Sequence, residues 1–152
     1  MKIIDKSLKI AYGLFKPNPY QRRYHFAIAF DGKKPIGIGQ NNPIKMNAKA
    51  KMVGDLFNIQ TYIEFPFLHA EVNLLCNLWN EYENIDPSWK VVVLRINRPG
   101  KLMMSKPCNN CEKILSKVNL KKIIWSGENG VFCQNSKDSF SSSALTNPNI
   151  EV

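Results

Sequence analysis

The chain has 152 residues, with 21 lysine and arginine residues against 12 aspartate and glutamate residues, so its formal net charge is +9. Hydrophobic residues make up 44% of the sequence, which excludes a wholly disordered chain and suffices for the core of one domain. No run approaches the ~20 apolar residues of a membrane-spanning helix, and the first residues lack the apolar block of a secretory signal. Four cysteines are too few for a disulfide scaffold. We therefore expect a soluble, cytoplasmic protein that does not act at a membrane.

The positive charge is concentrated in the first third of the chain. Residues 1–51 contain eleven basic and two acidic side chains, whereas residues 52–152 contain ten of each, so the whole excess lies before residue 52. Such asymmetry indicates an anionic partner, such as a nucleotide phosphate or single-stranded nucleic acid, or a solvated basic face that only aids solubility.

The first half of the chain predicts one helix and one hairpin. Apolar residues between positions 4 and 15 recur at helical spacing, and two prolines follow them. Residues 24–30 and 36–39 have the pattern of two strands joined by a turn, which predicts an antiparallel hairpin. Residues 41–66 are expected to form a long loop with at most one helical turn. Its aromatic side chains either pack the loop or stack bases, and they are Phe57, Tyr62, Phe65 and Phe67.

The second half predicts alternating helices and strands. Helical patterns begin at Phe67 and Pro107, and the apolar run 91–94 between them is typical of a strand covered on both faces. An Asn-Gly turn joins the last two predicted strands, 121–125 and 131–133, so we expect them to pair antiparallel.

This order of elements predicts an α/β fold of three layers, α/β/α, around one mixed five-stranded sheet. Residues 1–133 would form the single catalytic domain. Residues 134–152 are rich in serine and asparagine with few apolar anchors, so we expect a loosely held polar tail.

Two short motifs stand at the starts of two predicted helices. They are His-Ala-Glu at residues 69–71 and Pro-Cys-Asn-Asn-Cys at residues 107–111. The imidazole of His69 and the thiolates of Cys108 and Cys111 provide three ligands for Zn²⁺ and leave the fourth position for water, which is the arrangement of a catalytic zinc site. Glu71 would reach that water without binding the metal, and it would carry the proton.

The pattern H-x-E followed by P-C-x-x-C resembles the zinc-dependent cytidine and deoxycytidylate deaminase superfamily. The resemblance covers most of the chain, and residues 95–108 look like phage and bacterial members. It implies hydrolytic deamination of cytosine to uracil, with Glu71 passing protons to the ring and to the departing amine.

The resemblance also implies a set of substrate contacts. The segment 37–44 resembles the one that carries a substrate-contacting asparagine in family members, and that role falls to Asn41, with Asn42 as the alternative after a one-residue slip. The backbone around Ala70 and Pro107 would help to hold the base. Trp125 could stack near the pocket, although a strand tryptophan is more often plain core.

The cysteines also permit other interpretations. The pair at 108 and 111 alone fits a thioredoxin-like dithiol, which leaves the histidine and Glu71 unexplained. A closed structural zinc site would need Cys76 or Cys133 as a fourth ligand, but Cys76 lies two turns along the predicted helix, about 10 Å from His69. We interpret both of these other cysteines as small apolar core residues.

Three classes of function stay open. The first is a zinc deaminase acting on a free nucleoside or nucleotide such as cytidine, deoxycytidine or deoxycytidylate. The second is the same chemistry on cytosine or adenosine in single-stranded DNA or RNA, and the third is a non-catalytic zinc-stabilised binding module. The antiparallel last hairpin resembles that of free cytidine deaminases. Nucleoside enzymes of that branch often have cysteine as the first ligand, whereas this chain has His69, and the basic first third favours a substrate that carries phosphate. The resemblance is also compatible with a homo-oligomer.

Overall fold

The computed structural model describes residues 1–127 and 130–135 and the backbone of residues 142–145. The helices are α1 (Ile3–Leu14), α2 (Ala48–Phe57), α3 (Gln60–Glu64), α4 (Ala70–Glu81) and α5 (Asn109–Lys117). The strands are β1 (Arg23–Asp31), β2 (Lys34–Gln40), β3 (Asn42–Met46), β4 (Phe67–Leu68), β5 (Lys90–Asn97), β6 (Leu102–Met103), β7 (Lys122–Ser126), β8 (Phe132–Asn135) and β9 (Ser142–Leu145). Within this part of the chain, no helix has both the length and the apolar character needed to cross a bilayer.

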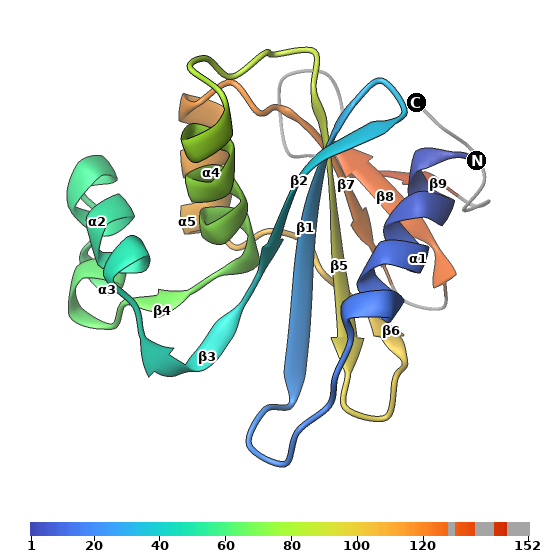
Figure 1. The fold of residues 1–152 in the computed structure, drawn as a ribbon, viewed down its shortest axis with the longest axis horizontal. Coiled ribbons are helices and arrows are strands. Elements are labelled where there is room, and N and C mark those ends of the chain that lie inside the picture. Colours follow the sequence, from blue (N-terminus) through green and yellow to red (C-terminus); the bar gives the residue numbers. More distant parts are fainter. Residues whose placement is uncertain (128–129, 136–141, 146–152) are drawn as a thin grey trace.

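One mixed seven-stranded sheet forms the centre of the molecule (Figure 1). Its order is β2-β1-β5-β7-β8-β9, and the short β6 pairs with β5. β5 and β7 run parallel, whereas β7 and β8 pair antiparallel with Trp125 opposite Cys133. The five predicted strands and the antiparallel last hairpin are therefore confirmed, and β6 and β9 widen the sheet. A separate two-stranded sheet joins β3 and β4.

Helices cover both faces of the sheet, as Figure 1 shows, with α1 on one side and α4 and α5 on the other. Successive side chains of a strand point to opposite faces, and β1 shows this clearly. Phe26 and Ile28 pack with α1, whereas Ala27 and Ala29 pack in the larger core beneath α4 and α5. The two buried apolar layers confirm the predicted three-layer α/β/α architecture, because each helix buries its apolar stripe against the sheet.

The segment between β2 and α4 differs from the prediction. Instead of a long loop with one turn, residues 42–68 form β3, α2, α3 and β4. α2 begins where the side chain of Asn47 accepts a hydrogen bond from the backbone N–H of Lys49 at 2.8 Å, and it ends at Asn58, whose φ of 54° is left-handed. Both are standard helix boundaries. The prediction failed because most of α2 is exposed and lacks a strong apolar stripe.

The chain after residue 133 adds further pairing to the sheet. β8 continues to Asn135, and β9 pairs antiparallel with it over residues 142–145. The rest of the predicted polar tail lies outside the described residues, as does Asn129 of the predicted turn. The boundary between a domain of residues 1–133 and a tail of residues 134–152 stays a prediction.

A glycine in β2 allows α4 to lie directly on the sheet. A Cβ added at Gly39 would collide with the backbone of Ala70 and Leu74 in the first turn and a half of α4. Backbone atoms cannot move aside as a flexible side chain can, so this position sets how close the start of α4 lies to the sheet.

Gly39→Ala is therefore expected to lower the free energy of unfolding by about 1–3 kcal/mol or more, because it overpacks a rigid contact. Gly13→Ala is the matched control, since a Cβ at Gly13 in α1 meets nothing within 4 Å. That change should stabilise by about 0.5–1 kcal/mol, because alanine favours a helix over glycine. Urea unfolding of both variants measures the difference, and equal stability of the two would refute this account of Gly39.

Candidate metal centre

The two sequence motifs meet where α4 and α5 begin. His69 is the residue that precedes α4, and Cys108 occupies the same place before α5. Cys111 lies in the first turn of α5, and its backbone N–H donates to Cys108 Sγ at 3.5 Å. Because α4 and α5 lie next to each other on one face of the sheet (Figure 1), their N-terminal ends bring the three side chains together.

The three side chains form a compact group of donors. His69 Nδ1 lies 3.8 Å from Cys108 Sγ and 3.5 Å from Cys111 Sγ. All three ligand atoms lie within 4.8 Å of one another, so one metal ion could contact them all. One imidazole nitrogen and two sulfurs are a donor set that suits Zn²⁺. Cys111 is buried, His69 half-buried and Cys108 exposed.

The other cysteines do not join this group. In the described residues both Cys108 and Cys111 are free thiols, as are Cys76 and Cys133. Cys76 is buried within α4, and Cys133 is half-buried on β8. Neither lies in the donor group, so a closed site with a fourth cysteine has no support in this part of the chain.

The three donor side chains have pKa values that are shifted in different directions. The hydrogen bond from Cys111, helped by His69 and Tyr62 and opposed by burial, lowers the pKa of Cys108 to about 3. The same bond to Cys108, together with burial, raises the pKa of Cys111 well above its ordinary value. Burial has the largest effect on His69 and lowers its pKa, but the hydrogen bond to Cys108 and the charges of Cys108 and Glu71 together outweigh burial and raise the pKa of His69. The low pKa of Cys108 favours its thiolate, which is the form of cysteine that binds a metal ion.

Glu71 lies beside the donors but is not one of them. It is in the first turn of α4, is only 6% exposed, and lines the cavity next to His69. Burial raises the pKa of its carboxyl group, against the lowering effect of a backbone hydrogen bond and of the charge on His69. A buried carboxyl group with a raised pKa holds a proton more readily than an exposed one, as a proton carrier requires.

A cavity of about 320 Å³ opens beside the donor group. Its volume lies at the lower end of the range for small-molecule sites, which is about 300–1,000 Å³. The lining residues come from β1, the β2–β3 connection, the start of α4 and the start of α5, and they are Arg23, His25, Asn41, Pro43, Phe67, Leu68, His69, Ala70, Glu71, Lys106 and Cys108.

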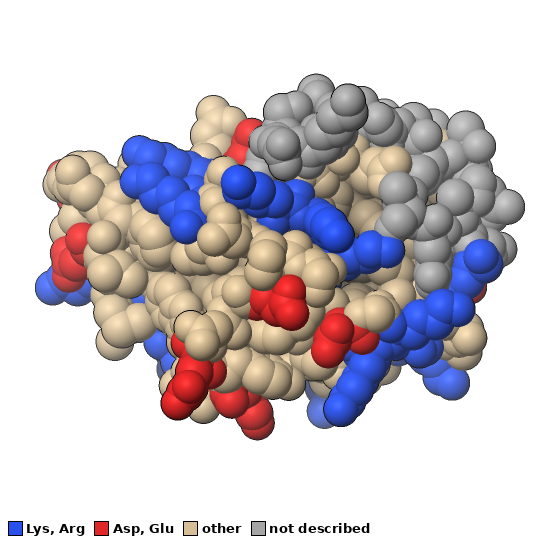
Figure 2. Space-filling model, turned by 90° about the horizontal axis from the view of Figure 1, so that it is seen from above, with Lys and Arg blue, Asp and Glu red and all other residues tan. Residues whose placement is uncertain are grey.

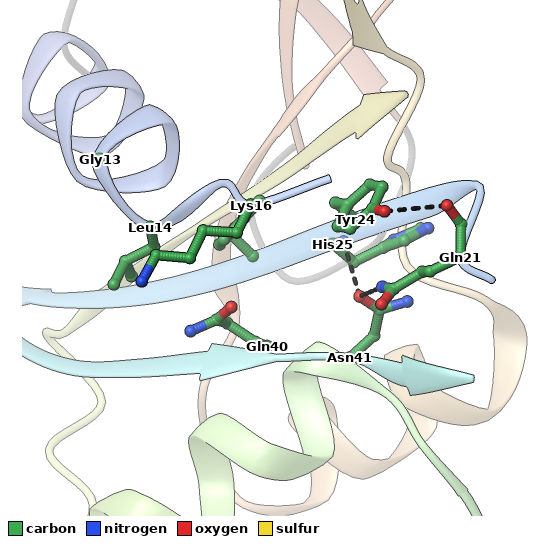
Figure 3. A pocket seen from close by; sticks show the side chains of 9 residues that line it. Gly13, Leu14, Lys16, Gln21, Tyr24, His25, Gln40 and Asn41 are labelled. Atoms are coloured by element: carbon green, nitrogen blue, oxygen red, sulfur yellow. Dashed lines mark hydrogen bonds between the residues drawn. The ribbon is translucent and has the colours of Figure 1, made fainter. Parts of the chain in front are cut away.

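Asn41 is held firmly at this cavity. Its Oδ1 accepts the backbone N–H of His25 at 2.9 Å and the side-chain amide of Gln21 at 3.4 Å, and its Nδ2 donates to the carbonyl of Arg23 at 3.1 Å. Figure 3 shows Asn41, His25 and Gln21 from an adjoining cavity of about 380 Å³, which these three residues line. Asn42 accepts from the backbone of Ile44 instead and does not line the cavity beside the donors.

The two remaining predicted contacts lie further from the cavity. Pro107 is buried directly before Cys108 but is not among the lining residues. Trp125 on β7 is 1% exposed and packs in the core beneath α4 and α5, and the amine of Lys106 lies 5.6 Å from the centre of its ring. Base stacking by Trp125 stays an untested prediction.

The sequence interpretation missed three residues of the site. Arg23 and Lys106 line the cavity, and the Tyr62 hydroxyl lies 3.0–3.5 Å from all three donor atoms. The sequence marks Tyr62 only as one aromatic residue of the expected loop. No local signal identifies its role, because α3 reaches the donors only through the tertiary fold.

His25 makes the stability of the fold depend on pH. Burial, and then the charges of Arg95, His69 and Arg23, lower the pKa of His25 to about 4. In the unfolded chain His25 binds a proton near pH 6.5, whereas in the folded chain it does so only near pH 4. The folded state therefore loses stability as pH falls from 6.5 towards 4. Between pH 7 and pH 4.5, the metal-free His25→Gln variant should lose about 2–3 kcal/mol less free energy of unfolding than the metal-free wild type. Urea unfolding at both pH values measures this loss, and equal losses in variant and wild type would contradict it.

The chain is similar to several solved structures. No family model matches the chain, and no curated protein matches it. Among solved structures, the dCMP deaminase of cyanophage S-TIM5 in apo form aligns with a TM-score of 0.52 and 21% identity, over 86% of this chain and 89% of that chain. The cytidine deaminase of Mycobacterium leprae aligns with a TM-score of 0.47 and 14% identity, over 87% and 89% of the two chains. That of Mycobacterium tuberculosis gives 0.43 and 16%, over 83% and 82%.

The cyanophage structure aligns with 86% of this chain, and because the identity is 21% this likeness shows the fold alone. The mixed sheet and the two helix layers agree with that likeness. The chain has the cytidine deaminase-like fold.

Proposed function

We propose that this chain is a zinc-dependent hydrolase that removes the amino group of cytosine in a nucleoside or nucleotide. The observation that carries the proposal is the convergence of His69, Cys108 and Cys111 within 4.8 Å, beside a cavity that the buried Glu71 also lines. The donor set fits Zn²⁺, and three protein ligands leave room for a fourth. When bound, the ion would supply a water with a pKa lowered to about 7.

Glu71 has the properties that the proton transfers require. Replacing the ring amine by oxygen consumes one water and releases one ammonia, so a proton must leave the water and another must reach the amine. The carboxyl group of Glu71 lines the cavity, and burial raises its pKa above the ordinary value of a carboxyl group. It would hold the proton, pass it to the ring nitrogen, and return one to the departing amine.

The cavity wall favours a substrate that carries phosphate. Arg23 and Lys106 both line it and contribute positive charge, and His25, whose lowered pKa keeps it neutral at pH 7, lines the same wall. A single phosphate on a nucleotide would be attracted there. The similar cyanophage protein is a dCMP deaminase, which agrees with this choice. We therefore place deoxycytidylate ahead of cytidine and deoxycytidine.

The test is to incubate the zinc-loaded protein with cytidine, deoxycytidine, their monophosphates, adenosine and a single-stranded oligonucleotide. Release of ammonia and formation of the uracil product from a monophosphate, with a higher kcat/KM than from the matching nucleoside, is the expected result. Product from none of these compounds would refute the proposed enzyme and leave a non-catalytic zinc-stabilised module as the remaining function.

Single-stranded nucleic acid is the second candidate. Figure 2 shows that Lys and Arg side chains gather in bands on one face, and the excess charge lies in residues 1–51. Binding of many phosphates releases many counterions, so affinity for an oligonucleotide would fall steeply with salt, whereas one phosphate gives a shallow dependence. Activity measured across a salt series on a monophosphate and an oligonucleotide separates the two.

A further inference from the structure

Arg95 on β5 has a buried nitrogen that lacks a partner. The residue is half-buried, and among the described residues its Nε accepts no contact and donates no hydrogen bond. Buried polar atoms of folded proteins nearly always have a partner, and leaving a charged donor unpaired costs more than leaving a neutral one. Arg95 is therefore a position at which a ligand could supply the missing acceptor.

The register of the sheet places Arg95 on the face that carries the metal centre. Arg95 pairs directly with His25 of β1, and directly paired residues share one face of a sheet. Ala27 and Val93, the next pair on that face, lie in the core beneath α4 and α5. His25 lines the cavity beside the donor group, so Arg95 stands next to the cavity wall, although it is not itself a lining residue.

Two further cations flank Arg95. Arg23 lies on β1 two residues before His25 and thus on the same face of the sheet. On the other side of β5, Arg95 pairs with Met103 of β6, and Lys106 follows shortly after that strand. Arg23 and Lys106 both line the cavity. We call Arg23, Arg95 and Lys106 the cationic cluster.

The positive charge of this cluster is not offset. Burial and then the charge of Arg23 lower the pKa of Arg95, and no carboxylate of the described residues acts against them. Arg98, just after β5, is different, because its guanidinium donates to the carbonyls of Gln21 and Pro19 at 3.1 and 3.0 Å. Neighbouring guanidinium groups without a counter-charge repel each other, so a bound anion would remove a cost that the free protein bears.

We propose that the cationic cluster is the subsite for the phosphate of a nucleoside monophosphate. The inference rests on the proposed function, since it takes the cavity as the place of the nucleotide. A phosphate monoester carries a charge of about −1.5 to −2 at pH 7 and has three terminal oxygens, which suits several cations at once. Guanidinium groups present pairs of N–H donors that match two of these oxygens, and the unpaired Nε of Arg95 provides such a donor.

Kinetics of Arg95→Gln in the zinc-loaded protein test the proposal. The kcat/KM for deoxycytidylate should fall by about 10–100-fold, the effect of losing a hydrogen bond to a charged group. The kcat/KM for deoxycytidine should stay unchanged, because it carries no phosphate. An equal loss on both substrates would show a merely structural role, and no loss on either would show that the phosphate is held without Arg95. A larger loss on a single-stranded oligonucleotide would assign the cluster to a strand backbone. Each of these results would overturn the proposal.

Lys90→Gln is the matched control, because Lys90 lies at the opposite end of β5. At about 3.3 Å per residue, it is about 17 Å from Arg95 along the strand. This variant loses the same charge and should keep the wild-type preference for deoxycytidylate over deoxycytidine. If it loses that preference as Arg95→Gln does, net charge explains the effect and the subsite is refuted.

Thermal unfolding gives a second readout that needs no turnover. The product deoxyuridylate should raise the Tm of wild type more than deoxyuridine does, because a ligand of the folded state stabilises it by mass action. In Arg95→Gln the two compounds should give equal shifts. Without ligand the variant should unfold no earlier than wild type, since the change removes a repulsion between cations.

The two readouts separate the subsite from the enzyme. Equal Tm shifts from deoxyuridylate and deoxyuridine in wild type would overturn the subsite, while deamination of deoxycytidine would still support the proposed function. A protein that deaminates none of the compounds, yet shows the larger shift with deoxyuridylate and loses it in Arg95→Gln, would refute the proposed function and retain the phosphate subsite.

Discussion

Glu71→Gln is expected to lower kcat for cytosine deamination by about 10²–10⁴-fold, the range that a general acid–base group contributes. The amide has nearly the same shape as the carboxyl group but cannot accept and return the proton. Glu71 is not among the three donors, so the variant should still bind one zinc per chain. Steady-state kinetics with a cytosine monophosphate and metal analysis of the same preparation measure both effects.

Glu112→Gln is the matched control, because Glu112 lies in the first turn of the neighbouring α5 and does not line the cavity. It should keep activity close to that of wild type. If both variants keep their activity, Glu71 is not the proton carrier. If Glu71→Gln loses zinc together with activity, the carboxyl group is part of the metal site, contrary to its place beside the donors.

Cys111→Ser is expected to weaken zinc binding by more than about 100-fold. Loss of a residue that only contacts a metal ligand weakens binding by about 10–100-fold, and loss of a ligand should cost more. A serine hydroxyl keeps its proton at neutral pH and is a much weaker ligand than a thiolate. Because Cys111 is fully buried between His69 and Cys108, no other described cysteine can replace it. Competition with a coloured chelator measures the change in affinity.

Cys133→Ser controls for the loss of a thiol as such. Cys133 is half-buried on β8 and outside the donor group, so this variant should bind zinc with unchanged affinity. Wild-type affinity in Cys111→Ser, or an equal loss in both variants, would contradict the proposed ligand set.

The parts of the fold with strong periodicity were predictable from the sequence. The helix over residues 3–14, the hairpin of β1 and β2, and the buried β5 each carry an apolar pattern that the core then uses. α2 and α3 carry no such pattern, since Met52 and Leu56 are exposed and the packing between the two helices depends on Gly54. Asn47 at the start and Asn58 at the end of α2 were usable signals that the loop interpretation overlooked.

The candidate site was predictable only where residues lie close in sequence to a motif. The meeting of His69 with Cys108 and Cys111 followed from the two motifs, and the distances agree with it. Arg23 and Tyr62 reach the site from β1 and α3, and only the tertiary fold determines that they do. Trp125 is the opposite case, because the sequence suggested a contact with the substrate but the side chain is completely buried in the core.

The zinc content of the purified protein tests the central claim most directly. We predict one zinc ion per chain, bound by reduced Cys108 and Cys111 and lost when either is replaced by serine. A protein that takes up no zinc, or in which these two sulfurs form a disulfide under reducing conditions, would contradict the account.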